Sequence, residues 1–189
     1  RGQPTCVLVS GDPYWHGAGG SLAGHVSPRE TIVHPAASTA SLASARLGWR
    51  IEDIVVLGLH AAPLAILRAH LRRGAKLLVL ARDGAAVGDI ARLLAGAGAG
   101  DSRLHVLEAL GGPRERIGTT IAEGFAREDV IAPVAVAIEV TGDAPVPIGQ
   151  GLPDALFEHD GQLTRREVRA ITLSSLAPRG GELLWDIGL

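Results

Sequence analysis

Ser10, Gly11, Asp12 and Pro13 are the first residues whose types and spacing could do chemistry, because they directly follow the apolar run Thr5–Val9. This run predicts a strand, and open α/β sheets bind ligands beyond the carboxyl ends of their strands. Gly11 would let the backbone approach a ligand closely, and Pro13 would fix the exit of the turn. The Asp12 carboxylate would accept hydrogen bonds, either from a ligand or from the backbone of a following helix. These residues alone leave both roles open.

The glycine clusters are not typical of nucleotide-binding loops. The cluster at 96–100 (GAGAG) follows a predicted helix rather than a strand, which favours a flexible helix end. The cluster at 16–20 (HGAGG) follows a predicted strand, but Leu22 stands where a dinucleotide fingerprint has its third glycine. The only lysine, Lys76, follows Ala75 and not the glycine of a phosphate-binding loop. Nucleotide hydrolysis is therefore not expected.

Histidine, cysteine and serine patterns predict neither a metal site nor a hydrolase. The histidines form no HExxH pair, and the single cysteine, Cys6, cannot build a structural zinc site. A Gly-x-Ser-x-Gly elbow is also absent. Most of the histidines are expected to be ordinary surface or core residues. They are His16, His25, His34, His60, His70, His105 and His159.

Seven short runs rich in aliphatic residues are predicted strands. Most of them are continuously apolar, which is typical of strands covered on both faces. The runs are Thr5–Val9, Thr31–His34, Ile54–Leu59, Lys76–Ala81, Leu104–Leu107, Val134–Val140 and Glu182–Ile187.

Helical patterns separate these runs. One apolar face recurs through Leu64–Leu71, and a second through Val87–Leu94. A third helix is expected to begin at Thr164, which forms a capping box with Glu167. Its inward face would hold Val168, Ile171, Thr172 and Leu176. Strands that alternate with helices favour a mostly parallel α/β fold.

Composition predicts a globular protein. The chain has 189 residues, of which 47% are hydrophobic and 20% charged, so disorder is not expected. A net charge of −2 gives no reason to expect nucleic acid or a membrane surface as partner. One cysteine, no secretory segment and no apolar run long enough to span a bilayer together favour a cytoplasmic protein. The proline- and glycine-rich stretch 141–153 predicts a linker.

Eight segments resemble the tetrapyrrole methylases, and they occur in that family's order over nearly the whole chain. They are SGDPYWHG (10–17), PAASTAS (35–41) with RLGW (46–49), LH (59–60), LVL before DG (78–84), VLE (106–108), GGPRERI (111–117), FEHDGQLTRREVRA (157–170) and ELLWDIG (182–188). The resemblance implies an α/β fold: a two-lobed class III methyltransferase core without its N-terminal part, followed by the start of a Rossmann-like methyltransferase domain. The last two segments resemble the junction between those two parts.

The activity that the resemblance implies is S-adenosylmethionine-dependent C-methylation. A precorrin would be methylated at C5 and C15 and would lose a carboxyl group from an acetate side chain, as a step of cobalamin biosynthesis. The sulfonium donor is already activated, so the protein mainly aligns donor and carbon and excludes water. A homodimer or higher oligomer is also implied.

The resemblance further implies a set of residues that bind the cofactor. In the first lobe these are Ser10, Gly11, Asp12, Trp15, Ser38, Thr39, Arg82 and Leu110, and in the last segment Thr164 and Gly188. At Arg82 and Leu110 the backbone would make the contact. Ser38 with Thr39, and Thr164, are equally explained as helix starts. A proton-abstracting base is not identified, because Asp12, His16 and His60 all have the right type.

The resemblance also divides the chain. Residues 1–49 would be the C-terminal part of the first lobe, 50–141 the second lobe, 142–160 the linker, and 161–189 the truncated start of the second methyltransferase domain. A first strand with its glycine-rich loop is expected before residue 1, and a glycine-rich cofactor loop after Gly188. Two alternatives remain: a methylase of this fold with another substrate, and a non-catalytic fragment that binds or hands on a tetrapyrrole.

Overall fold

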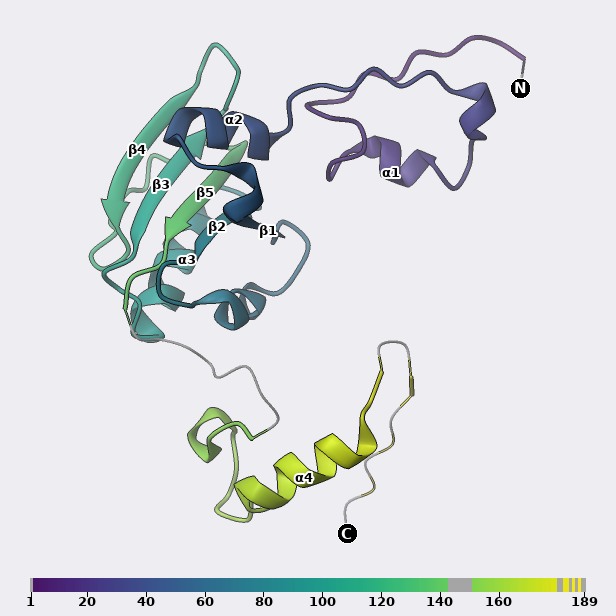
Figure 1. Ribbon diagram of the computed structural model, residues 1–189. Coiled ribbons are helices and arrows are strands. Elements are labelled where there is room, and N and C mark those ends of the chain that lie inside the picture. The colour runs from purple at the N-terminus through teal and green to yellow at the C-terminus, as the bar shows by residue number, and fades with distance from the viewer. Residues whose placement is uncertain (1, 143–150, 180–181, 184, 186, 188–189) are drawn as a thin grey trace. The chain divides into compact units, whose positions relative to one another are not determined.

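The computed structural model describes residues 2–142, 151–179, 182, 183, 185 and 187 (Figure 1). The chain divides into two compact units, Arg1–Pro145 and Val146–Leu189. In the first unit, helices pack on a five-stranded sheet. The second unit contains the α-helix Arg166–Leu176.

The sheet of the first unit is mixed. Its strands are β1 (Ile54–Gly58), β2 (Lys76–Leu80), β3 (Arg103–Glu108), β4 (Arg116–Ile121) and β5 (Val134–Glu139), in the spatial order β1-β2-β5-β3-β4. Only β1 and β2 pair in parallel, whereas the other three pairs are antiparallel. The expectation of a mostly parallel sheet is therefore wrong. No helix lies between β3, β4 and β5, so each strand turns back, and β5 inserts between β2 and β3.

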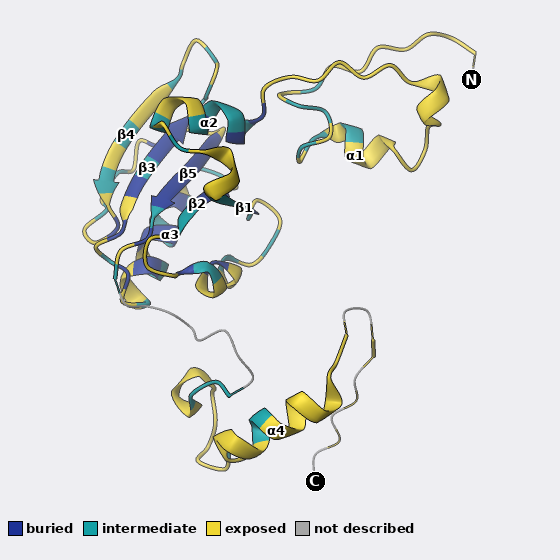
Figure 2. Ribbon diagram, viewed as in Figure 1, coloured by how far each residue is buried: buried dark blue, intermediate teal, exposed yellow. Residues whose placement is uncertain are grey.

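Alternating side chains of the central strands build two cores, one on each face of the sheet. In β5, Val136 and Ile138 face one core, and Ala135 and Ala137 face the other. Figure 2 shows these central strands as buried along most of their length. The continuously apolar runs thus lie in strands covered on both faces, as predicted.

Helices α2 (Thr39–Leu47) and α3 (Ala85–Gly96) cover the opposite faces of the sheet (Figure 1). Through Ala40 and Ala43, α2 contacts the alanines of β5, so its backbone can lie close to the sheet. The larger core under α3 contains Ile90 and Leu94.

The ends of α2 and α3 follow from local sequence. The Asp83 carboxylate accepts a hydrogen bond from the Ala86 N–H at 2.9 Å at the start of α3. Gly48 ends α2 with a φ of 66°, in the left-handed region that favours glycine. The glycine cluster at 96–100 lies where α3 ends, as predicted. The apolar face at 64–71 forms a 3-10 helix, Leu64–His70, rather than an α-helix.

Two predicted strands near the N-terminus do not form. Thr5–Val9 and Thr31–His34 are not in a sheet, and this part of the chain carries only the short helix α1 (Ala18–Leu22) and a 3-10 turn at Pro28–Glu30. Leu8 and Ile32 are exposed by 91% and 85%. A strand needs a neighbour to accept and donate its hydrogen bonds, and no described strand runs beside either segment. Apolar composition alone therefore gave the wrong prediction.

The second unit begins with a 3-10 turn, Asp154–Leu156, and contains α4 (Arg166–Leu176). The predicted capping box is wrong: the N-cap residue of α4 is Arg165, and its side chain makes no capping hydrogen bond. The face expected to point inward is exposed, with Val168 at 49% and Ile171 at 67%. Within Glu182–Ile187 the described residues form no strand.

The described residues contain neither a bilayer-spanning helix nor a cluster of metal ligands. None of their helices is both long and apolar enough to cross a bilayer. They also contain no group of three or more histidine, cysteine, aspartate or glutamate side chains arranged to hold a metal ion.

Packing at the start of α3 predicts the effect of Gly84→Ala. A methyl group at this position would lie 1.9 Å from the Val130 carbonyl oxygen, so the backbone must shift. We expect Gly84→Ala to destabilise the protein by about 1–3 kcal/mol, as overpacking does elsewhere. A methyl group at Gly88, in the same helix, would lie 3.6 Å from the Arg92 guanidinium, which is ordinary contact. We therefore expect Gly88→Ala to stabilise the protein by about 0.5–1 kcal/mol. Urea unfolding measures both, and equal midpoints for the two variants would contradict this packing.

Candidate functional site

The carboxyl ends of three strands lie at one edge of the sheet. Strands β1 and β2 are parallel, and β2 and β3 are both antiparallel to β5, so β1, β2 and β3 run in the same direction. The loops that follow them start at Leu59, Ala81 and Ala109. We call this edge, with its loops 59–63, 81–84 and 109–115, the carboxyl edge.

The turn at 10–17 is held together by the Asp12 carboxylate. Its Oδ1 accepts a hydrogen bond from the Tyr14 N–H at 2.9 Å, and its Oδ2 accepts one from the Ala36 N–H at 3.4 Å. Gly11 has a φ of 69° and lies against the Ala37 carbonyl. The turn therefore packs beside the residues that lead into α2. Asp12 does not cap the following helix, because the N-cap of α1 is Gly17 and no side chain caps it. Its carboxylate bonds to backbone within the turn and before α2, and a contact with a ligand stays a prediction.

Ser38 begins α2. Its Oγ accepts a hydrogen bond from the Ser41 N–H at 3.1 Å, and only 9% of the residue is exposed. Thr39 is the first residue of the helix. Both residues thus act as a helix start, and a further contact with a ligand stays a prediction.

Trp15 and Leu110 bring the turn and the carboxyl edge together. Both are half-buried and pack against the same core as Ala40 of α2 and Leu80 of β2. Gly111 contacts α2 as well, since a methyl group there would lie 3.0 Å from the Leu42 Cδ1 atom. The turn, the start of α2 and the loops after β2 and β3 therefore share one neighbourhood.

Several backbone groups near this edge make no hydrogen bond with the described part of the protein. Among the described residues, Ser10, Arg82 and Leu110 have main-chain N–H and C=O groups that make no hydrogen bond with the protein. The Arg82 side chain is already engaged, because its Nε donates to the Asp83 Oδ2 at 3.0 Å. An adenosyl amino acid carries ring nitrogens, ribose hydroxyls and a charged amino acid group, and it can be bound by such paired donors and acceptors.

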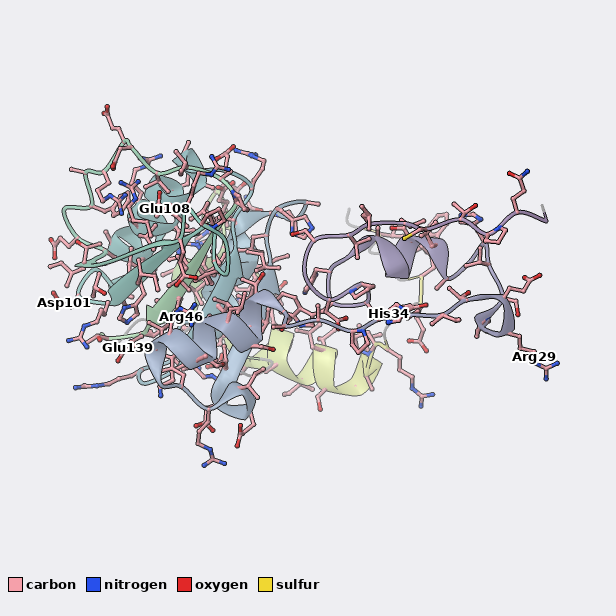
Figure 3. All side chains as sticks on the ribbon, turned by 90° about the horizontal axis from the view of Figure 1, so that it is seen from above. Arg29, His34, Arg46, Asp101, Glu108 and Glu139 are labelled. Carbon is pink, nitrogen blue, oxygen red and sulfur yellow. The ribbon has the colours of Figure 1, made fainter. Side chains whose placement is uncertain are left out.

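An ion pair between Arg46 and Glu115 fixes the loop at 109–115. Arg46 of α2 binds Glu115 through two hydrogen bonds of 2.5 and 3.1 Å, and Glu115 also accepts from the Gly111 N–H at 2.7 Å. Figure 3 labels Arg46 on its helix. The loop that carries Leu110 is therefore tied to α2 as well as to the sheet.

Glu108, the last residue of β3, is a fully buried carboxylate (labelled in Figure 3). Arg116 of β4 binds it with two hydrogen bonds of 2.7 Å, and Arg127 donates to it at 3.1 Å. The Ile131 N–H adds a further hydrogen bond at 2.9 Å. Both arginines also bind Asp129, at 2.7 and 3.0 Å. This network joins β3, β4 and the loop before β5 directly beneath the residues that lead to Leu110.

The charges of the network are stabilised by one another. Burial raises the pKa of Glu108, but the hydrogen bonds from Arg116, Ile131 and Arg127 outweigh it and hold that pKa below its usual value. Hydrogen bonds from Arg127 and Arg116 lower the pKa of Asp129 to about 2. Both groups are therefore ionised at neutral pH.

Sequence reasoning missed this network. The signal that could have found it is the register of β3 and β4, because Glu108 and Arg116 stand opposite each other in that hairpin. Strand β4 itself was not predicted, since its alternating residues include Gly118 and two threonines and form no apolar run.

Two of the predicted cofactor residues are not among the described residues of the first unit. Thr164 lies in the second unit, where its carbonyl accepts a hydrogen bond from Arg169. Gly188 lies outside the described residues, as does Asp186.

Comparison with protein families gives two matches. A model described as tetrapyrrole (corrin/porphyrin) methylases matches residues 1–124. A model described as a precorrin methyltransferase domain matches residues 155–189.

Individual relatives agree with these matches. The chain is 52% identical to a precorrin-6Y C(5,15)-methyltransferase (decarboxylating) from a Sinorhizobium species, over all of this chain and 46% of the relative. It is 37% identical to the protein of the same name from Mycobacterium tuberculosis, over 99% of this chain and 47% of the relative. The chain thus spans about half the length of the curated relatives it matches.

A solved structure shows the same fold. The uroporphyrin-III C-methyl transferase from Thermus thermophilus, complexed with S-adenyl homocysteine, aligns with a TM-score of 0.51 and 23% identity. The alignment covers 68% of this chain and 62% of that protein.

The buried carboxylate predicts a pH-dependent loss of stability. The pKa values of Glu108 and Asp129 are lowered on folding, so their ionised forms stabilise the protein above the unfolded pKa values, and this stabilisation is lost as the pH falls. We expect Glu108→Gln to lower the free energy of unfolding by about 3 kcal/mol at pH 7, because it removes the buried carboxylate that both arginines share and leaves them Asp129 alone. The difference from the wild type should shrink as the pH falls below the ordinary pKa of a glutamate, 4.5.

Unfolding midpoints measured across this pH range test the prediction. Glu52→Gln is the matched control, since Glu52 pairs with the exposed Arg50 and its loss should lower the unfolding midpoint far less than Glu108→Gln does. If the stability difference between the wild type and Glu108→Gln stayed constant from pH 7 to pH 2, the charge of Glu108 would have no part in that difference.

Proposed function

Because the chain belongs to the tetrapyrrole methylase family, we propose that its protein methylates C5 and C15 of a precorrin, with loss of a carboxyl group from an acetate side chain. S-adenosylmethionine would be the methyl donor, and the reaction would be a step of cobalamin biosynthesis. Support comes from the two relatives named for this reaction, which match essentially the whole chain at 52% and 37% identity.

The observation that carries the proposal is the convergence at the carboxyl edge. The turn at 10–17, the start of α2 and the loop holding Leu110 lie in one neighbourhood through the core shared by Trp15 and Leu110. The free backbone groups of Ser10, Arg82 and Leu110 give this neighbourhood the donors and acceptors that an adenosyl amino acid requires.

The chain's residues would act by binding and alignment. When bound, the sulfonium supplies an activated methyl group that needs no metal or covalent enzyme intermediate for its transfer. Backbone groups at Ser10, Gly11, Arg82 and Leu110 would orient the donor. The half-buried Trp15 side chain would exclude water from one side of it.

The second unit supports a further part of the proposal. Its match to a precorrin methyltransferase domain over residues 155–189 suggests a second reaction centre, for which Thr164 and Gly188 would contribute cofactor contacts. Residues 1–49 and 50–141 would form two lobes around the first centre, 142–160 the linker, and 161–189 the start of the second domain. A homodimer or higher oligomer is part of this expectation.

A cytoplasmic location is also proposed. Cys6 is exposed as a free thiol, and such thiols persist in reducing compartments.

Titration of the full-length protein with S-adenosylhomocysteine tests the cofactor site. Asp12→Ala removes the hydrogen bonds to Tyr14 and Ala36, so the turn loses its fixed position beside α2. We expect about tenfold weaker binding at the first site, which corresponds to ~1.4 kcal/mol. Ser27→Ala removes a comparable hydrogen bond, to the Arg29 N–H, from the same segment and should leave the affinity unchanged.

Two outcomes would contradict the proposal. If the wild-type protein bound no S-adenosylhomocysteine, the assignment as a methyltransferase would fail. If Asp12→Ala and Ser27→Ala bound it equally well, the turn at 10–17 would not belong to the site. Product analysis with isotopically labelled methyl donor and precorrin then identifies the carbons that receive the label.

A further inference from the structure

We infer that His16 accepts the proton that the methylated carbon releases, and that His60 positions its ring. This inference rests on the proposed function, and it selects among the three candidate bases that the sequence leaves open. The two histidines come from different elements, since His16 ends the turn at 10–17 and His60 follows β1 at the carboxyl edge.

His16 is held in an uncommon backbone conformation. Its φ is 52°, in the left-handed region that residues with a side chain rarely adopt. The turn is closed behind it, because Gly17 and Gly19 pack against the Pro13 carbonyl so tightly that a methyl group at either would lie 2.6 or 2.5 Å from that oxygen. Such strain is retained where the surrounding structure fixes it, and it occurs preferentially at functional sites.

The turn directs the His16 ring onto the end of β1. A methyl group on Gly58, the last residue of that strand, would lie 2.9 Å from the His16 Cε1 atom and 3.4 Å from the His60 Cε1 atom. Glycine at this position therefore makes room for both imidazoles. Their ring centroids are 6.1 Å apart and the planes are nearly perpendicular, at 89°.

The nitrogens of both rings are uncommitted. Within the described residues, neither His16 nor His60 makes a hydrogen bond or an ion pair, and both are exposed. Asp12 differs, because its two carboxylate oxygens already accept hydrogen bonds from backbone N–H groups. These bonds hold the Asp12 carboxylate against the backbone of the turn and of the segment before α2, whereas the nitrogens of both imidazoles are unbonded in the described part of the chain, so the geometry favours the histidines over Asp12.

Trp15 places the pair beside the proposed cofactor site. Its ring meets the His16 ring edge-on at 4.9 Å, and it also packs against the core that Leu110 and Leu80 contact. The imidazoles thus lie next to the neighbourhood assigned to the donor.

The proton balance of C-methylation requires an acceptor. The carbon uses an electron pair to form the new C–C bond, and the S–CH₃ bonding pair leaves with sulfur, which becomes a neutral thioether. The carbon then gives up its hydrogen as a proton to restore the double bond of the ring system. An imidazole nitrogen of His16 takes this proton and becomes an imidazolium, which is the exchange that imidazole performs near neutral pH. Solvent at the exposed ring removes the proton after turnover.

Chemical rescue of His16→Gly in the full-length protein tests the inference. Glycine tolerates the left-handed backbone at this position, so the turn is expected to survive. We expect single-turnover methyl transfer to fall by about 10²-fold or more, as general-base removal does elsewhere. Affinity for S-adenosylhomocysteine should stay within twofold, and added imidazole should restore a substantial part of the rate.

Two further variants complete the experiment. His60→Gln should lower kcat by less than His16→Gly does, leave the KM for the precorrin unchanged, and not respond to imidazole. His34→Gly removes another histidine of the N-terminal segment, labelled in Figure 3, and should keep full activity.

The inference is overturned if His16→Gly keeps its rate, or if its loss of rate is not restored by imidazole. It is also overturned if His16→Gly loses affinity for S-adenosylhomocysteine by the same factor as it loses rate. His16 would then be a structural residue. Failure of the proposed function looks different, because the wild-type protein itself would then bind no S-adenosylhomocysteine.

Discussion

Burial of Glu108 constrains the part of the carboxyl edge that follows β3. A carboxylate without water must be compensated by charge and hydrogen bonds, and here β4 supplies Arg116 while the loop before β5 supplies Arg127 and the Ile131 N–H. The partners come from two parts of the chain, β4 and the loop before β5, so both parts must be in place together. The network thus holds the loop that begins at Ala109, from which Leu110 reaches the proposed cofactor site. A local electrostatic requirement in this way fixes the start of one loop at the carboxyl edge.

The two faces of the sheet have different tasks. Under α3, large aliphatic side chains such as Ile90 and Leu94 fill the main core and provide most of the apolar burial. On the α2 face, alanines of α2 and β5 lie in a smaller core with Leu78 and Leu107, and Trp15 and Leu110 pack against it. The larger core supplies most of the stability, whereas the smaller one brings a helix start, a turn and a loop into one neighbourhood.

Periodicity predicted the four strands that are buried, as well as α3, because continuous apolar runs in a covered sheet have one stable arrangement. It failed at Thr5–Val9 and Thr31–His34, where composition is right for a strand but pairing depends on a neighbour that no local pattern reveals. It also missed the antiparallel insertion of β5, since connection length rather than residue type decides strand direction. For the site, the motif at 10–17 located the turn, but only the structure separates the bonded carboxylate of Asp12 from the free rings of His16 and His60.

The alanines that separate α2 from the sheet also restrict how this protein can evolve. Ala40, Ala43, Ala135 and Ala137 act as a single spacer, whose thickness sets the distance between helix and strands. A larger residue at one of these positions would lift the helix and carry Ser38 away from the carboxyl edge. Such a change is tolerable only when an opposing position becomes smaller at the same time, and alanine leaves almost nothing to remove. The four positions therefore form a block with few accessible mutational paths, and all of them lie in the core.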